Sequence, residues 1–185
     1  MKILLLGYLA LALVVPGVCD AQSVTWTAAP GVYVEDDSGG GNQLGPAVVL
    51  GATVPAGGPL AFTFDPMLAR TDFPVGPDEL HRNIGAASVT VNVMAGGERA
   101  SVGATFGVGV LAWDDISETD PGFRSGADAE QIFAAGLEAR FAVGGSWGIT
   151  AFARDMVSGL VNRILDPSEG GLEHRFVLGA GVYFR

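Results

Sequence analysis

The amino-acid sequence predicts an all-β protein that folds as a closed, up-and-down, antiparallel eight-stranded transmembrane β-barrel. Three observations lead to this prediction. After residue 22 the apolar side chains recur every second residue, which is typical of strands rather than helices. Eight such segments follow one another, and each is long enough to cross a bilayer at a tilt. The connections between them alternate between short and long, as they do in membrane barrels.

The N-terminal segment has the pattern of a secretory signal. Lys2 supplies a positive charge before the apolar run 3–15, which is too short to span a bilayer as a helix. The small residue Ala21 suits a cleavage site. We therefore expect a signal peptide over residues 1–21 and a single transmembrane β-barrel domain over residues 22–185.

Composition limits what the mature chain can be. Cys19 is the only cysteine, so a lipoprotein acylated at Cys19 is the alternative for the N-terminus, although the residues before it suit that motif poorly. A mature chain without cysteine must be held by a large apolar area, a closed sheet or a membrane. The net charge of −10 and the absence of lysine after Lys2 argue against nucleic acid as a partner. The mean hydropathy of +0.38 is high for a soluble domain.

The eight predicted strands share a length suited to crossing a bilayer. They are expected at residues 24–34, 47–56, 60–69, 84–95, 100–112, 131–143, 147–158 and 174–184. The short connections are residues 57–59, 96–99 and 144–146, and the long ones are residues 35–46, 70–83, 113–130 and 159–173. This alternation predicts tight periplasmic turns, long external loops and periplasmic ends for the mature chain.

The first three strands contain residues that fit a closed sheet badly. Pro30, Pro46 and Pro66 lie in or near them, and a closed barrel has no free edge to receive proline, so we expect bulges. A three-residue turn between the second and third strands pairs Ala56 with Leu60 on the outer face.

The fourth and fifth strands alternate clearly. Val89, Val91 and Val93 share one face of the fourth strand, while Thr90 lies on the other. In the fifth strand, valine and phenylalanine alternate with glycine, serine and threonine. A four-residue turn pairs Val93 with Val102, which puts both on the apolar face.

The last three strands follow the same rule. In the sixth, Phe133, Leu137 and Phe141 share one face, and Glu138 and Arg140 share the other. Glycines would fill a soluble core poorly, and a surface of phenylalanine and valine would aggregate in water. The apolar faces are therefore predicted to point outward to lipid, with the glycine and charged faces toward the lumen.

Charged and aromatic residues support this orientation. Most acidic residues after position 21 fall in or beside the four long connections. Aromatic residues lie near strand ends and resemble two interfacial girdles: Trp26, Phe62, Phe141, Trp147 and Phe184 at the short-turn side, and Tyr33, Trp113, Phe133 and Phe176 at the other.

The C-terminal half resembles the small outer-membrane β-barrel superfamily, the OmpA/OmpX-like group of eight-stranded barrels, over about residues 84–185. The residues that carry the resemblance are Gly136-x-Glu138-x-Arg140, Trp147-Gly-Ile, Arg154-Asp155 and the final stretch from Val177 to Phe184. The resemblance implies an outer-membrane location, insertion by the outer-membrane assembly machinery, and lipid and lipopolysaccharide as neighbours of a monomer. It does not fix a function, because this fold carries several.

The final stretch is similar to the C-terminal assembly signal of that group. Its matching residues are Gly179, Val182 and Phe184. It departs from the pattern because Val177 stands where a polar residue is usual, and because Arg185 follows the aromatic residue.

Four charged residues are predicted to face the lumen near mid-depth: Asp65, Glu138, Arg140 and Arg154. In the expected register Arg154 lies opposite Gly136 and diagonal to Glu138. We predict an internal ion-pair network that plugs the barrel, because isolated charges would be costly in its interior. The alternative is a gate in a narrow channel for small solutes.

The sequence predicts a non-enzymatic structural or surface-interaction protein without a cofactor. Outer-membrane lipid A deacylases use a His-x-Ser pair, and neither His81 nor His174 has serine two positions later, although a lipid-modifying enzyme stays as an alternative. The acidic segment 114–120 could bind calcium, but it lacks the spacing of a calcium loop and is interpreted as a solvated loop.

Overall fold

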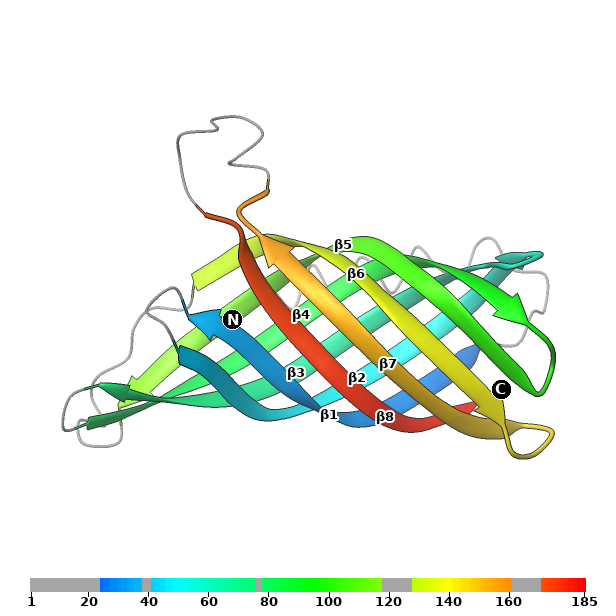
Figure 1. Cartoon of the computed structure of the whole chain (residues 1–185), viewed down its shortest axis with the longest axis horizontal. Helices are drawn as coiled ribbons and strands as arrows, with labels where there is room; N and C mark the ends of the chain where they lie inside the picture. Colours follow the sequence, from blue (N-terminus) through cyan, green and yellow to red (C-terminus); the bar gives the residue numbers. More distant parts are fainter. Residues whose placement is uncertain (1–23, 38–40, 76–77, 118–127, 161–170) are drawn as a thin grey trace.

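The computed structural model describes residues 24–37, 41–75, 78–117, 128–160 and 171–185 (Figure 1). Its eight strands are β1 (Thr25–Asp37), β2 (Gly41–Gly57), β3 (Leu60–Val75), β4 (Asp78–Gly96), β5 (Ala100–Ser117), β6 (Asp128–Ala142), β7 (Trp147–Ser158) and β8 (Glu173–Phe184). Each strand pairs with the next along the chain, and β1 pairs antiparallel with β8. The predicted closed, up-and-down, eight-stranded barrel is confirmed. No helix in the described part of the chain is long and apolar enough to cross a membrane.

Several strands run further toward the long connections than predicted. β3 continues to Val75 and β4 begins at Asp78, and the two stay paired over this whole extension. Glu35 and Asp115, which were expected in loops, lie on β1 and β5. These extensions carry polar and charged side chains, so hydropathy alone made them look like loops.

Hairpin registers agree with the prediction on strand faces and differ in two turns. Arg154 lies opposite Gly136, as expected. Between β2 and β3, however, Gly57 rather than Ala56 pairs with Leu60, and the register shifts there. Gly57 has a positive φ of 107°, which allows this tighter turn. Other residues adopt such a φ only at a cost in free energy.

The β4–β5 turn also differs from the prediction. Ala95 pairs with Val102, so Val93 faces Ala104 instead of Val102. Gly96, with a φ of 130°, lets β4 continue one residue further before the chain turns. The observed partner of each β4 residue lies two residues further along β5 than predicted. A shift by an even number of residues leaves every side chain on its predicted face.

The prolines do not create bulges, contrary to the prediction. Pro30, Pro46 and Pro66 each keep a direct partner in an uninterrupted register, namely Val48, Val32 and Ala87. In an antiparallel ladder each backbone N–H points to one neighbouring strand only. A proline therefore costs one hydrogen bond on one side, and the β1–β8 ladder has no residue pair at Pro30.

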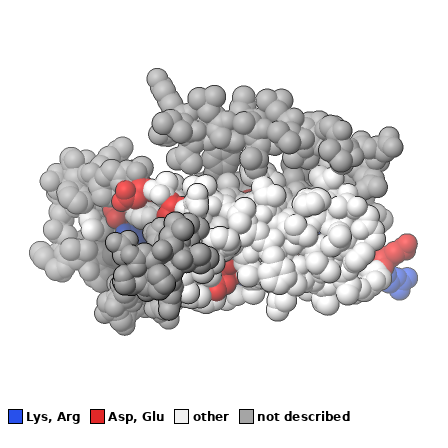
Figure 2. Space-filling model, turned by 90° about the horizontal axis from the view of Figure 1, so that it is seen from above, with Lys and Arg blue, Asp and Glu red and all other residues white. Residues whose placement is uncertain are grey.

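The outer face is apolar, and buried apolar and polar side chains line the interior. Leu68 and Leu137 are 71% and 68% exposed on the outside. In Figure 2 charged side chains of the described residues gather toward the two ends and leave an uncharged stretch between them. Two aromatic residues depart from the predicted girdles: Tyr33 is completely buried, and Trp113 packs against the interior apolar cluster. Both follow the inward alternation of their strands.

Candidate functional site

The side chains inside the barrel form three layers along its axis, and the inward-facing residues of β6 contribute to each of them. Glu138 lies in a polar layer nearer the short turns, Ile132 lies in an apolar layer, and Glu130 lies in a second charged layer nearer the long connections. The apolar layer is built from side chains of all eight strands, which range in size from alanine to tyrosine: Tyr33, Ala47, Val49, Met67, Ile84, Ala86, Leu111, Ile132, Met156 and Val177.

The layer nearer the short turns holds the four predicted lumen charges. Arg154 Nη2 lies 3.1 Å from Asp65 Oδ2, and Arg140 Nε lies 2.6 Å from Glu138 Oε1. Arg154 thus pairs across the lumen, from β7 to β3, rather than with its diagonal neighbour Glu138. All four side chains are at most 11% exposed.

Hydroxyl and amide groups link the two ion pairs into one network. The Thr90 hydroxyl lies 3.4 Å from Asp65 Oδ2 and 3.2 Å from Asn92 Oδ1, and Asn92 Nδ2 donates to Thr63 over 2.6 Å. The link continues from Thr63 to the hydroxyl of Thr53 over 2.9 Å. We call these groups, with the four charged residues and Thr150, the lower network.

Arginine and threonine complete the lower network on the opposite wall. Arg140 Nη2 donates to Thr53 over 3.2 Å, and the Thr150 hydroxyl donates to Glu138 Oε1 over 3.0 Å. Every buried charge in this layer therefore has a charged partner and at least one further polar or aromatic neighbour. These hydrogen bonds and ion pairs offset the free-energy cost of burying charges in a low-dielectric interior.

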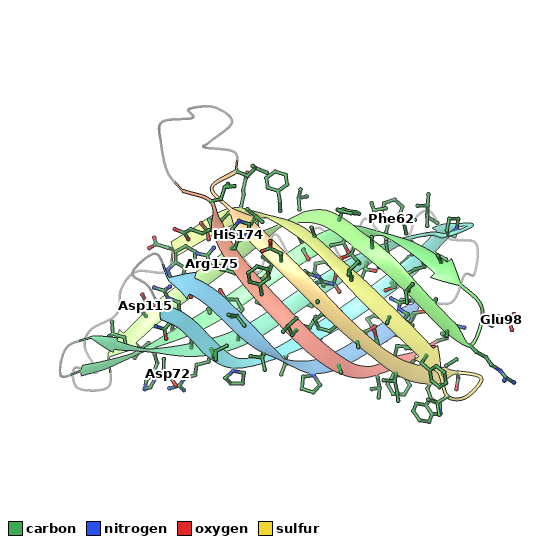
Figure 3. The ribbon with its side chains drawn as sticks, viewed as in Figure 1. Phe62, Asp72, Glu98, Asp115, His174 and Arg175 are labelled. Atoms are coloured by element: carbon green, nitrogen blue, oxygen red, sulfur yellow. The ribbon has the colours of Figure 1, made fainter. Side chains whose placement is uncertain are left out.

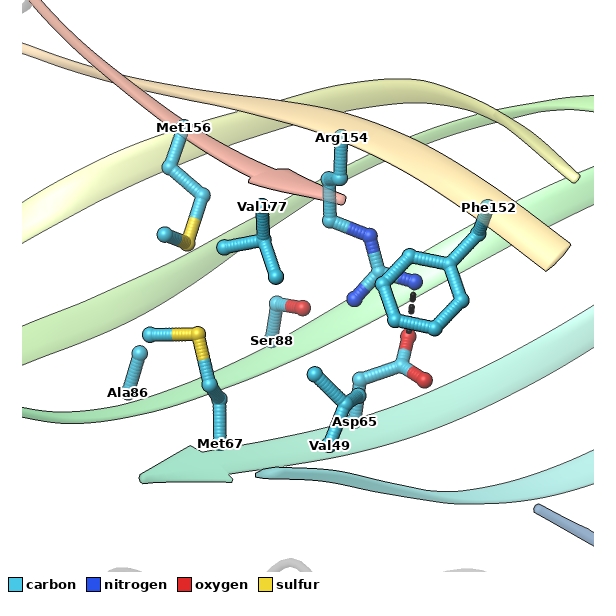
Figure 4. A pocket seen from close by; sticks show the side chains of 9 residues that line it. All are labelled: Val49, Asp65, Met67, Ala86, Ser88, Phe152, Arg154, Met156 and Val177. Carbon is cyan, nitrogen blue, oxygen red and sulfur yellow. Dashed lines mark ion pairs between the residues drawn. The ribbon is translucent and has the colours of Figure 1, made fainter. Parts of the chain in front are cut away.

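Aromatic rings and small residues fill the remaining space. The guanidinium carbon of Arg154 lies 5.7 Å from the centre of the Phe152 ring, and that of Arg140 lies 5.9 Å from the Tyr183 ring. Two cavities of about 10 Å³ each flank the Asp65–Arg154 pair, and Figure 4 shows the side chains around one of them. Each cavity has room for about one water molecule.

The layer nearer the long connections was missed by the sequence reasoning. Arg82 contacts both oxygens of Asp115, at 2.7 and 3.0 Å, and Glu35 Oε1 at 3.1 Å. Arg175 donates to the same Glu35 oxygen over 3.1 Å and also to Glu130. Glu35 therefore connects two arginines from β4 and β8.

Arg175 has the larger set of partners. It also donates to Glu173 over 2.7 Å and to Ser158 over 2.9 Å, and its side chain is only 3% exposed. The guanidinium groups of Arg82 and Arg175 lie 5.8 and 5.5 Å from the Trp113 ring. We call Glu35, Arg82, Asp115, Glu130, Glu173 and Arg175 the upper cluster; Figure 3 shows Arg175 and Asp115 at the end opposite Glu98.

A signal for the upper cluster was present in the sequence. The lumen-facing alternation of β4 through Thr90 and Ser88, continued backward, reaches Arg82, and that of β8 through Val177 reaches Arg175. Arg175 lies on the inward face of the predicted strand 174–184, whereas the other members lie in acid-rich segments that the hydropathy pattern assigns to loops.

His174 lies at the end of the barrel that carries the upper cluster (Figure 3), and both histidines follow the outward alternation of their strands, next to the inward Arg175 and Arg82. His174 Nδ1 lies 2.9 Å from Asp155 Oδ2, and the ring stacks on Phe176 at 6.2 Å between centres. His81 Nδ1 lies 2.5 Å from Asp72 Oδ1. Each histidine is thus paired with an aspartate on the neighbouring strand.

The architecture matches solved structures of outer-membrane barrels. Neisserial surface protein A aligns with a TM-score of 0.60 at 12% identity, over 88% of this chain and 99% of that chain. OprG from Pseudomonas aeruginosa aligns with a TM-score of 0.53 at 12% identity, over 89% and 97%. Ail of Yersinia pestis aligns with a TM-score of 0.50 at 15% identity, over 88% and 100%.

The fold is that of a small outer-membrane β-barrel. The resemblance predicted from the sequence is thereby confirmed for the fold. No protein-family model matches the sequence, and no curated protein matches it either. At these identities the likeness shows how this barrel is built and leaves its activity open.

The residues of the predicted assembly signal occupy different surroundings in this small outer-membrane barrel. Phe184 is 50% exposed and pairs with both Trp26 and Trp147 at the short-turn end. Val182 also follows the outward face of β8, whereas Gly179 faces the lumen beside Phe152.

Other predicted features lie partly or wholly outside the described residues. The signal peptide, residues 1–21, is outside them, as are Glu118 and Asp120 of the acidic segment. Asp115 of that segment is bound to Arg82. Within the described residues, no three side chains of Asp, Glu, His or Cys are grouped in a way that could hold a metal ion.

Proposed function

We propose that this protein is an integral outer-membrane barrel whose lumen is closed to solutes and which acts in a structural or surface-interaction role through its external end. The observation that carries the proposal is the lower network. It joins opposite walls of the lumen through the Asp65–Arg154 ion pair and through a run of hydroxyl and amide groups that reaches the Glu138–Arg140 pair on β6. Each cavity beside it has room for about one water molecule.

The outer-membrane location rests on the apolar outer face together with the fold. An exposed surface of leucine, valine and phenylalanine is an aggregation liability in water and suits a lipid environment. In this proposal a signal peptide directs export, the assembly machinery inserts the chain as a monomer, and lipopolysaccharide surrounds the external half. Folded membrane barrels resist detergent until heated, so outer-membrane fractions should contain a band whose gel mobility changes on boiling.

Planar-bilayer recording tests the closed lumen. We expect no sustained conductance from the purified wild-type barrel. The double variant Asp65→Ala/Arg154→Ala removes the ion pair across the lumen and should produce small conductance openings. Such openings would also demonstrate that the recording can detect conductance through this barrel. Steady conductance from the wild type would contradict the closed lumen and favour the alternative, a narrow passive channel.

A second candidate function rests on the His174–Asp155 pair. A carboxylate that holds one ring nitrogen of histidine is the arrangement that orients a general base, and His174 follows the outward face of β8 near the long connections. It would support a lipid-modifying enzyme, although Phe176 stands where the deacylase motif has serine. Mass spectrometry of lipid A after expression, with His174→Ala as control, tests it; unchanged lipid A removes this candidate.

A further inference from the structure

Phe152 occupies a central place beside the ion pair that crosses the lumen. Its side chain points inward from β7 and lines both cavities that flank Asp65 and Arg154 (Figure 4). Arg154 follows two positions later on the same face of the strand, and its guanidinium carbon lies 5.7 Å from the centre of the Phe152 ring. A ring at this distance attracts the cation and limits where it can move.

The ring has this position because β8 carries glycine opposite it. Phe152 and Gly179 are direct partners in the β7–β8 register. A Cβ atom at Gly179 would lie 2.6 Å from Cζ and 2.9 Å from Cε1 of Phe152, closer than carbon atoms approach without displacement. The nearest backbone atom, the carbonyl oxygen of Pro30, would lie 3.1 Å away. An added methyl group would therefore mainly displace the ring.

Gly181, one step along the same face of β8, provides a contrast. A Cβ atom there would lie 2.2 Å from the carbonyl oxygen of Ala28 and 2.5 Å from the Cα of Ala29. These are backbone atoms of β1, which cannot be trimmed by substitution. Gly181 is thus needed for the close approach of two strands, whereas Gly179 is needed for a single side chain.

We propose that Phe152 is a positioning residue that holds Arg154 against Asp65, and that Gly179 serves to make room for its ring rather than to be recognised during assembly. The proposal rests on the proposed closed lumen for its functional meaning. It also separates two roles within the C-terminal stretch: Gly179 acts inside the finished barrel, while Val182 and Phe184 face outward.

A double-substitution experiment tests the proposal. The variants are Gly179→Ala, Phe152→Ala and their combination, and Phe152→Leu replaces Phe152→Ala if the smaller side chain prevents folding. For each, we would measure the amount in the outer membrane, the temperature at which the detergent-resistant band is lost, and openings in planar bilayers. We expect Gly179→Ala to reach the membrane at wild-type level, to lose the folded band at a lower temperature and to show brief openings.

The coupling between the two positions decides the outcome. In the Phe152→Ala background, Gly179→Ala should cause no further drop in that temperature, because the ring it displaces is gone. Gly181→Ala is the matched control, and its effect should be the same with or without Phe152. An equal effect of Gly179→Ala in both backgrounds, or a loss of membrane insertion that does not depend on Phe152, would overturn the proposal.

The failure of this inference can be told apart from the failure of the closed lumen. If the wild type conducts, the closed lumen is wrong, but the temperature coupling between Phe152 and Gly179 still measures the contact. If the wild type is closed and the coupling is absent, only the positioning role is wrong.

Discussion

The lower network and the upper cluster are built from the same residue types and differ in balance and in contact with water. The lower network has two acids and two arginines, each at most 11% exposed. The upper cluster has four acids for two arginines, and its side chains range from 3% exposed at Arg175 to 60% at Glu173. One layer is neutral and enclosed, and the other is acidic and open on one side.

This difference shows where charge balance is required. Inside the barrel an unpaired charge is expensive, so each carboxylate of the lower network is matched by one guanidinium and by hydroxyl groups. At the mouth, water and ions screen the excess acid, so additional carboxylates cost little. We therefore expect the energetic effect of removing a charge to fall from the lower network to the outer edge of the upper cluster.

The largest effect is expected in the lower network, for Asp65→Ala. This substitution leaves Arg154 buried without its carboxylate, and breaking a buried pair costs about 3–5 kcal/mol. The free energy of unfolding should fall by that amount in urea titrations of the barrel refolded into lipid vesicles, followed by tryptophan fluorescence.

The control for this prediction is the double variant Asp65→Leu/Arg154→Leu. Replacing both charges by apolar groups removes the unpaired ion, so most of the lost stability should return. If the double variant were as unstable as Asp65→Ala, or if Asp65→Ala cost less than the substitutions at the mouth, the proposed gradient would be wrong.

An intermediate effect is expected within the upper cluster, for Glu35→Gln. Glu35 Oε1 accepts from both Arg82 and Arg175, and the Glu35 side chain is 9% exposed. Both arginines keep other carboxylate partners, so no charge is left isolated. Hydrogen bonds to charged groups contribute about 1.5–3 kcal/mol, and the same urea titration should show a loss in that range.

The two layers also differ in how far the sequence could predict them. Period-two alternation places Asp65 and Arg154 on the inward face, and the structure has them there. It could not predict that they pair, because only closure of the sheet brings β3 opposite β7. The hairpin that sets Arg154 opposite Gly136 was predictable because a short glycine-rich turn allows few registers.

The upper cluster could not be recognised from hydropathy. Glu35, Arg82 and Asp115 lie on strand extensions whose polar residues resemble a loop, and the same cause placed Trp113 in a lipid-facing girdle instead of between two arginines. Alternation still holds in these extensions, but it is visible only when charged residues are allowed on the inward face. In a closed barrel that assumption is sound, because the inward face can be polar along its whole length.

The smallest effect is expected at the outer edge of the upper cluster, for Glu173→Gln. Glu173 contacts the same Arg175 that Glu35 contacts, yet its side chain is 60% exposed. Exposed ion pairs contribute about 0–1 kcal/mol, so the free energy of unfolding should fall by less than for Glu35→Gln. Both variants remove one negative charge from the surroundings of Arg175, and they differ in burial and in the second arginine, Arg82, that Glu35 also contacts. Equal losses for the two variants would mean that the upper cluster acts as a single buried unit, and that the mouth of the barrel is as enclosed as its centre.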